Sequence, residues 1–365
     1  MGDRMSKKII DGILKDWGER NFYSPLKGKK GRNIRSGGST QKATSAPKAS
    51  GPATREKLSR TAKKTPEVMV KISGGGKNMK HIKAHMDYMS RNGKIEIEDE
   101  NGDIHLGKEA VLEVRDAWAK GRIGIPLEGE KRKEAFNIIL SMPPGTDRQS
   151  VKDAARNFAK AQFSSHQYIF AAHQDEKHPH VHLTVKAVDD RGIRLNPRKG
   201  DLQFWREQFA EKLREQGIAA NATPRRARGI VQRTEKQAVK HIDREFAEGK
   251  RKQGAWVSKS QWHDAGIEIQ TGESRKNPVK DRIVDARKST QKSYGEIAKI
   301  LVAGDAADKQ LAIEIVQLVK GMPPIMTKHD ELVKKLIRET EKDIKQSNDK
   351  NNQLVQEKTP GDRDR

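Results

Sequence analysis

Two hydrophobic periods divide the middle of the chain into short segments of contrasting type. Apolar residues that alternate with polar ones, or form short runs, predict β-strands, whereas apolar residues three and four positions apart predict helices. The strand-like segments are 67–73, 94–99, 136–142, 166–173 and 178–185, and the helix-like segments are 79–91, 108–120, 149–163 and 202–217. This mixture predicts one α+β domain over residues 67–228, in which a β-sheet is flanked by helices.

The segments outside this domain have less apolar character. Residues 1–66 form a basic arm with 17 Lys and Arg against 5 Asp and Glu, a net charge of +12. Apart from a short amphipathic helix near 6–19, this arm is expected to be largely disordered. A charged helical linker region is predicted over 229–292, a small helical module over 293–345, and a disordered tail over 346–365.

Composition narrows the kind of partner. The chain carries 74 Lys and Arg against 50 Asp and Glu, a net charge of +24 that indicates a polyanionic partner. No apolar run reaches the roughly 18 residues needed to span a bilayer, so nucleic acid is expected and membrane insertion is not. The chain has no cysteine, so any metal must be held by histidines and carboxylates.

Four of the eleven histidines lie within residues 173–182, and the last three alternate with apolar residues as on a strand. The preceding segment is also strand-like, and the residues between the two can form a turn. Such a hairpin brings His173 beside His180 and His182, with His178 nearest the turn. Three neutral imidazoles arranged in this way can bind a divalent metal and leave positions open for a substrate oxygen.

The helix predicted over 79–91 places a tyrosine at the edge of its apolar face. His81, His85 and Tyr88 share helical spacing on a stripe beside the apolar one. Spacing alone favours an interfacial tyrosine with a solvated hydroxyl.

Three motifs in order resemble the relaxases, the mobilization nucleases of conjugative plasmids in the HUH endonuclease superfamily. They are VKISGGGK followed by DYMSRNGK, then ILSMPPGTD, then HxDxxHPHxHLTV, and they span roughly residues 67–228. The similarity is closest to the P-type mobilization clade that includes the T-DNA border nuclease. It implies an HUH-type antiparallel sheet. Two departures stand out: the domain begins some 66 residues into the chain, and Lys186 replaces an asparagine often found after the histidine strand.

The resemblance also implies a role for each matched residue. Tyr88 is the expected nucleophile, and Ser141 matches a motif that contacts DNA beside the scissile site. The proton of the tyrosine passes either to Asp175 or to a histidine that is not a metal ligand. For Asp175, the role favoured here is instead to accept a ring N–H from a ligand histidine. The metal ligands are His173, His180 and His182, with His178 in support, and the expected DNA contacts are Lys77, Lys80, Arg91 and Lys94.

The implied reaction is transesterification on single-stranded DNA at a plasmid transfer origin, leaving a 5′-phosphotyrosine. Mg²⁺ or Mn²⁺ is the expected metal, and the expected partners are an accessory relaxosome protein, a coupling ATPase and a type IV secretion system. The expected location is the bacterial cytoplasm, with transfer to the recipient cell together with DNA. The alternatives are a rolling-circle replication initiator or HUH transposase, a histidine-triad nucleotide hydrolase, and a basic DNA-binding scaffold that is not an enzyme.

Overall fold

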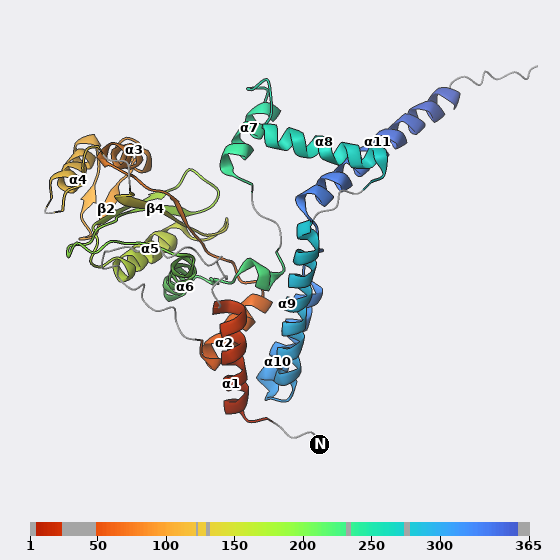
Figure 1. The fold of residues 1–365 in the computed structure, drawn as a ribbon, viewed down its shortest axis with the longest axis horizontal. Coiled ribbons are helices and arrows are strands. Elements are labelled where there is room, and N and C mark those ends of the chain that lie inside the picture. The colour runs from red at the N-terminus through yellow and green to blue at the C-terminus, as the bar shows by residue number, and fades with distance from the viewer. Residues whose placement is uncertain are drawn as a thin grey trace, which may run out of the picture. The chain divides into compact units, whose positions relative to one another are not determined.

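The structure is a computed structural model that divides into two compact units (Figure 1). It describes residues 5–23, 49–121, 123–128, 132–230, 235–273 and 278–356. The first unit is drawn from residues 1–224 and 294–320, and the second from residues 225–293 and 321–365.

The centre of the first unit is an antiparallel sheet of six strands in the order β1-β4-β6-β5-β2-β3. The strands are β1 (Met69–Gly74), β2 (Ile97–Asp99), β3 (Ile104–His105), β4 (Ala135–Ser141), β5 (Tyr168–His173) and β6 (His180–Lys186). Because each strand joins its neighbour in antiparallel register, the predicted α+β fold with an antiparallel sheet is confirmed.

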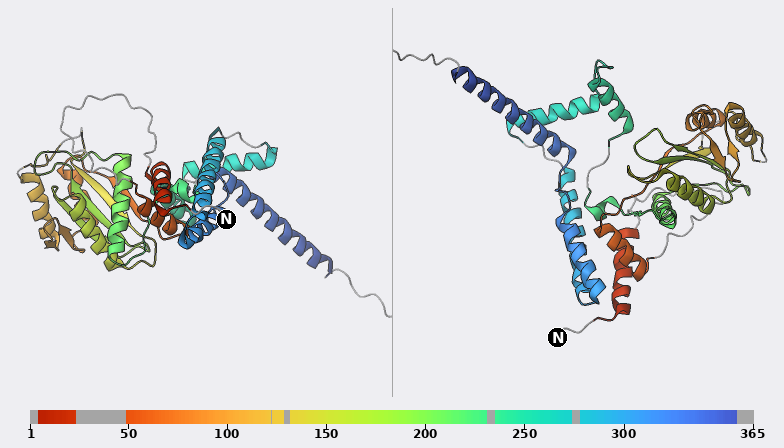
Figure 2. Two further views of the ribbon diagram at one scale, coloured as in Figure 1. Left: turned by 90° about the horizontal axis from the view of Figure 1, so that it is seen from below. Right: turned by 180° about the vertical axis from the view of Figure 1, so that it is seen from behind.

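Helices lie on both faces of this sheet (Figures 1 and 2). One face packs on α5 (Arg148–Gln162) and α6 (Lys199–Glu215), whereas α3 (Met79–Met89) and α4 (Lys108–Lys120) pack against the other.

On strand β6, the residues that alternate in the sequence lie on opposite faces of the sheet, in two different environments. Val181, Leu183 and Val185 are buried in the core with α5 and α6. Successive side chains on a strand point to opposite faces, so His180 and His182 face the side on which α3 lies. The alternating pattern therefore places His180 and His182 on the sheet face that α3 covers.

The N-terminal arm is more ordered than its composition predicts. Helix α1 (Lys7–Gly18) corresponds to the predicted amphipathic helix, and a π-helical segment, η1 (Glu19–Tyr23), follows it. The prediction of disorder is wrong for residues 51–62, which form helix α2 (Gly51–Ala62). The Ser50 hydroxyl oxygen caps α2 by accepting a hydrogen bond from the backbone N–H of Ala53. The arm residues 24–48 lie outside the described residues.

Tertiary contacts explain why α2 forms. It packs against α1 and α10 (Ala306–Lys320), and Leu58 is fully buried. Lys57 Nζ contacts Glu207 of α6 at 2.7 Å, with both side chains largely buried. Asn221 Nδ2 donates to Thr61 Oγ1 at 3.1 Å. The second half of the arm is therefore held against the central sheet domain through α6 and the segment that follows it.

The C-terminal half contains α7 (Gln237–Ala247), α8 (Trp256–Thr271), α9 (Pro278–Val302) and α11 (Lys328–Gln356). A short 3₁₀ helix, η2 (Arg225–Arg228), precedes them. In the second unit, α8 packs along α11, and the His329 side chain meets Glu268 at 2.6 Å.

In this half, the structure differs from two predictions made from the sequence. Residues 294–320, at the end of α9 and in α10, group with the first unit, so the stretch 293–345 does not form one separate module. Helix α11 continues to Gln356, so the tail is helical up to that residue, and residues 357–365 lie outside the described ones. Among the described helices, none combines the length and apolarity needed to cross a bilayer.

Candidate functional site

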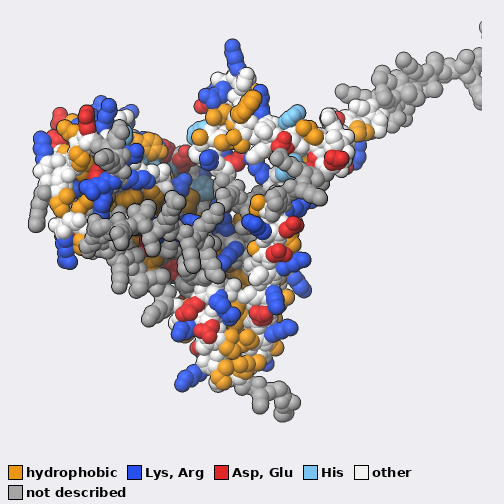
Figure 3. Space-filling view, viewed as in Figure 1, with side chains coloured by type: hydrophobic (Ala, Val, Ile, Leu, Met, Phe, Trp, Pro, Cys, Tyr) orange, Lys and Arg blue, Asp and Glu red, His pale blue; other side chains and the backbone are white. Residues whose placement is uncertain are grey.

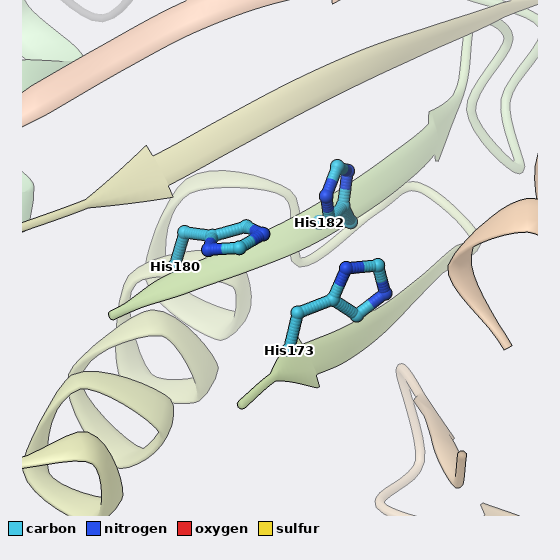
Figure 4. Close-up of side chains that lie close together, drawn as sticks. All are labelled: His173, His180 and His182. Atoms are coloured by element: carbon cyan, nitrogen blue, oxygen red, sulfur yellow. The ribbon is translucent and has the colours of Figure 1, made fainter. Parts of the chain in front are cut away.

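Three histidines converge where β5 ends and β6 begins (Figure 4). His173 and His180 are direct cross-strand partners, and His182 lies two residues further along β6 on the same face. One ring nitrogen from each side chain lies within 4.8 Å of the others. The predicted hairpin therefore brings these three residues together. His178 is exposed in the turn, outside this group.

Backbone carbonyls set the orientation of two of these rings. Nε2 of His173 lies 2.8 Å from the Met89 carbonyl oxygen, and Nδ1 of His180 lies 2.9 Å from the His178 carbonyl oxygen. A carbonyl only accepts, so these two nitrogens carry the protons. The lone pairs therefore lie on Nδ1 of His173 and Nε2 of His180. Nδ1 of His182 is buried and has no hydrogen-bond partner in the described part of the chain.

The electrostatic surroundings favour uncharged rings. Burial, reinforced by the charges of the neighbouring histidines, lowers the pKa of His182 to about 3. Burial is also the main reason that the pKa of His173 is lowered. Both rings are therefore neutral at pH 7, which is the state that binds a metal.

The donor set fits a divalent metal. Three imidazole nitrogens face one another, the carbonyls fix the tautomers of two rings, and the third ring has an orphaned buried nitrogen. Nδ1 of His173 also lies 3.4 Å from Nη2 of Arg91. A metal and this guanidinium thus compete for the same lone pair.

Tyr88 lies beside the histidines at the end of α3. The helix begins at an Asn78 cap, whose Oδ1 accepts from the backbone N–H of His81, and its apolar stripe is buried against α4 and β5. The Tyr88 side chain is 48% exposed, so its ring is open to substrate. Its centroid lies 5.4 Å from that of His182 and 5.9 Å from that of His173. The structure therefore brings the predicted nucleophile over the predicted metal ligands.

Two further side chains flank the Tyr88 ring. His85 stacks on it at a centroid distance of 5.8 Å and an interplanar angle of 26°. The Arg91 guanidinium carbon lies 5.1 Å from the centroid of the Tyr88 ring. The backbone of Arg91 has a left-handed conformation with φ of +51°. The next residue, Asn92, also has a positive φ, of +57°. These contacts place His85, which shares the helical stripe of Tyr88, and Arg91, which was expected as a DNA contact, against the Tyr88 ring.

Asp175 has a different partner from the one expected. Its Oδ2 accepts a hydrogen bond from Arg91 Nη2 at 2.5 Å, while the Met89 carbonyl holds the His173 ring. Desolvation acts to raise the pKa of the Asp175 carboxyl, but the hydrogen bond and charge of Arg91 outweigh it and lower that pKa. The carboxylate therefore binds the arginine, and the preferred expectation that it accepts from a ligand histidine is incorrect for this geometry.

The other predicted site residues lie at varying distances from the histidines. Ser141 is the cross-strand partner of His180 on β4 and is 3% exposed, with its hydroxyl donating to the Met142 carbonyl oxygen. Lys80 is exposed in the first turn of α3, roughly 12 Å from Tyr88 along the helix axis, and Lys77 is exposed just before the helix begins. Lys94 is exposed in the turn after α3.

Comparison with known proteins identifies relatives of this domain. The family model of the MobA/VirD2-like relaxase nuclease domain matches residues 86–218. The T-DNA border endonuclease VirD2 of Rhizobium radiobacter is 29% identical over 187 residues, which cover 46% of this chain and 44% of that protein. The protein of the same name from Agrobacterium fabrum is 29% identical over 186 residues, covering 46% and 42%. The chain thus spans less than half the length of these curated relatives.

A solved structure described as "Molecular Basis of Vancomycin Resistance Transfer in Staphylococcus aureus" matches 44% of this chain and 99% of that one at 14% identity. Its TM-score is 0.28, which is too low for any structural conclusion. The residues matched by the family model include Tyr88, His173, His180 and His182. Residues 86–218 therefore match the MobA/VirD2-like relaxase nuclease domain, and over this region the chain is similar to the VirD2 endonucleases.

Proposed function

We propose that this protein nicks one strand of DNA at a plasmid transfer origin by attack of Tyr88 on a phosphodiester. The observation that carries the proposal is the position of the Tyr88 ring, half exposed and directly beside His173 and His182. A tyrosine next to a triad of metal-binding type is the arrangement needed for covalent catalysis on a phosphate.

The proposed step replaces one phosphate ester with another. The Tyr88 oxygen forms a bond to phosphorus while the bond between phosphorus and the 3′ oxygen breaks. The phenol proton passes to a base, and the departing 3′ oxygen gains a proton to become a hydroxyl. The 5′ phosphate remains on Tyr88, so the ester is conserved and the strand can be rejoined by the reverse reaction.

His173, His180 and His182 would hold the divalent metal. When bound, the metal supplies Lewis acidity toward a phosphate oxygen and neutralises negative charge that develops at phosphorus. Imidazole ligands suit Mn²⁺ and later transition metals better than Mg²⁺, whereas the family resemblance implies Mg²⁺ or Mn²⁺.

Arg91 and Asp175 act as a pair that positions the nucleophile. Arg91 is anchored by Asp175, lies over the Tyr88 ring and approaches His173, so it joins the end of α3 to the histidine hairpin. Asp175 is a weak base because Arg91 lowers its pKa. The histidine outside the triad that contacts Tyr88 is His85, whose pKa is lowered mainly by burial, so its neutral ring is the better candidate for the proton acceptor.

The net charge of +24 supports a polyanionic substrate, and Figure 3 shows Lys and Arg side chains on the sheet domain and on the helices alike. In this proposal Arg91 and Lys94 contact DNA near the nick, while Lys77 and Lys80 contact it further away. The accessory relaxosome protein, the coupling ATPase and the type IV secretion system complete the proposed pathway from the bacterial cytoplasm into a recipient.

A single-turnover assay with a labelled single-stranded transfer-origin oligonucleotide tests the proposal. The expected product is a covalent DNA–protein species whose phosphotyrosine maps to Tyr88 and which requires a divalent metal. A nick that leaves no covalent species, or a phosphotyrosine at Tyr168, would refute it. Nucleotide hydrolysis that persists in chelator would instead indicate a histidine-triad hydrolase.

A further inference from the structure

A cavity lined largely by polar residues lies at the other end of the histidine strands. Its volume is about 310 Å³, and Lys186, the last residue of β6, is among its lining residues. His182 and His180 lie four and six residues before Lys186 on the same strand, so the cavity is about 13 to 20 Å from these two histidines at the usual rise per strand residue. The residues of the proposed nicking step do not line it.

Several lining groups are unusual for a packed protein interior. Lys186 is only 5% exposed, and its Nζ donates to Gln167 Oε1 at 2.8 Å. The Lys186 carbonyl oxygen accepts from Nδ1 of His166, so Nε2 of His166 carries a lone pair, is buried and has no partner among the described residues. Burial of such groups is costly unless they serve a purpose beyond packing. Lys186 is also the position at which this sequence departs from the relaxase pattern.

The cavity combines an amine with a carboxylate. Glu100 lines it and uses Oε2 to accept from the backbone N–H of Tyr168 at 3.2 Å, which leaves lone pairs on the carboxylate. Burial lowers the pKa of Lys186 and raises that of Glu100. A ligand that donates to Glu100 and accepts from Lys186 would compensate both groups for their burial.

The charges of the residues that line the cavity disfavour a simple ion as its ligand. The carboxylates of Glu100, Asp189 and Asp190 disfavour a phosphate, and the ammonium of Lys186 disfavours a metal cation. Apolar surface from Ile123 and Val188 suits a flat ring. A volume near the small end of the range for ligand sites fits a ligand the size of one nucleoside.

We propose that this cavity binds a guanine base of the single strand held by the nuclease domain, an inference that rests on the proposed DNA substrate. Guanine is the DNA base whose pairing edge presents two adjacent N–H donors beside a carbonyl oxygen. The donors match Glu100, and the carbonyl matches Lys186. Adenine and cytosine each present one amino group, and thymine presents one N–H between two carbonyls.

Binding of oligonucleotides to the full-length Tyr88→Phe protein tests this assignment without cleavage. Fluorescence anisotropy would compare a labelled 12-residue oligo-dT with versions that carry one dG, dA or inosine at each position in turn. We expect one position at which dG binds about tenfold more tightly than dT or dA. Inosine should recover only part of this gain, because it lacks the amino group on the pairing edge.

Substitutions of residues that line the cavity test whether the preference for dG arises there. Lys186→Met and Glu100→Gln should each abolish the dG preference, whereas the exposed controls Lys160→Met and Glu109→Gln should keep it. Absence of a dG preference at every position, or a preference that survives in a folded Lys186→Met and in Glu100→Gln, overturns the proposal. If Lys186→Met fails to fold by thermal melting, Glu100→Gln decides alone.

Free guanosine, which carries no phosphate, distinguishes binding of the free nucleoside from binding of a guanine within the strand. Competition by guanosine for the dG-specific part of binding supports a site for the base itself. Binding of guanosine that depends on Lys186, without any positional preference in the oligonucleotides, overturns the strand-bound guanine. Nicking by the unmodified protein is measured separately, so failure of the Tyr88 chemistry and failure of the guanine site give different results.

Discussion

The carbonyl oxygen of Met89 accepts a hydrogen bond from Nε2 of His173 at 2.8 Å. Met89 follows Tyr88 directly, so the end of the helix that carries the proposed nucleophile is bonded to a proposed metal ligand on β5. The Met89 side chain is fully buried, and its sulfur accepts from the Thr184 hydroxyl on β6. Movement of the helix end would therefore disturb the histidine ring, which links the position of Tyr88 to the geometry of the triad.

Tyr88→Phe should abolish strand cleavage and the covalent adduct while leaving metal and DNA binding within about twofold of the unmodified protein. The ring and its contacts with His85 and Arg91 remain, and only the attacking oxygen is lost. Denaturing gels with labelled DNA detect the adduct. Residual adduct in this variant would show that another nucleophile acts.

Alanine at His173, His180 or His182 should each lower metal affinity by at least about tenfold and abolish nicking. His178→Ala is the matched control, because only its backbone carbonyl contacts His180 and the substitution retains that carbonyl. Isothermal calorimetry with Mn²⁺ measures the affinities, and removal and return of metal with EDTA and Mn²⁺ should switch nicking off and on. Equal loss in all four variants would mean that the ligand set is different.

Arg91→Met should separate metal binding from catalysis. Loss of the guanidinium removes a donor that competes for Nδ1 of His173 and a nearby positive charge, so Mn²⁺ affinity should rise several-fold. The nicking rate should fall by about tenfold or more, because Tyr88 loses the cation over its ring and the turn after α3 loses its bond to Asp175.

Asn92→Gly is the control for Arg91→Met. It relieves a positive φ in the same turn without removing a contact to Tyr88 or the histidines. Its nicking rate should therefore stay unchanged. Weaker metal binding in Arg91→Met would contradict the competition for His173.

Glu207→Ala should lower the free energy of unfolding by about 3 kcal/mol, because it removes the carboxylate that the buried Lys57 contacts at 2.7 Å. Urea denaturation measures the change, and proteolysis within α2 should become faster. The exposed pair of Arg60 with Glu56 provides the control, since Glu56→Ala should cost less than about 1 kcal/mol. Similar effects of the two substitutions would show that α2 is not fastened through Lys57.

The protein should lose stability in acid, in part through His166. Burial is the main cause that lowers its folded-state pKa below that of the unfolded chain, near 6.5. Below that pH the unfolded chain takes up a proton that the folded protein resists, so this contribution is complete above about pH 6.5 and is lost as the pH falls. Urea unfolding of chelator-treated protein at pH 7.5 and 5.5 should show a smaller loss in His166→Asn. The difference can reach about 1.4 kcal/mol per pH unit, and an identical loss in both proteins would exclude His166.

Local patterns predicted those elements whose apolar residues are repeated at a regular period. The helix expected from Lys108 to about Lys120 matches α4, because its apolar stripe with Trp118 contains its own periodic signal. The alternation around His180 and His182 likewise predicted β6 and the convergence with His173. Motif order then supplied the chemistry that spacing alone left open, including the choice of Tyr88.

Contacts between distant segments decided the rest. Helix α2 has a weak apolar stripe, and its stability comes from α1, α6 and α10, which local composition cannot report. Arg91 looks like an ordinary basic DNA contact in the sequence, yet a left-handed turn directs it onto Asp175, His173 and Tyr88. The sequence by itself determined the strands, helices and reactive side chains, because those depend on short periods. Which carbonyl or carboxylate pairs with each of them was decided by the tertiary structure, because such pairs form only after the chain has folded.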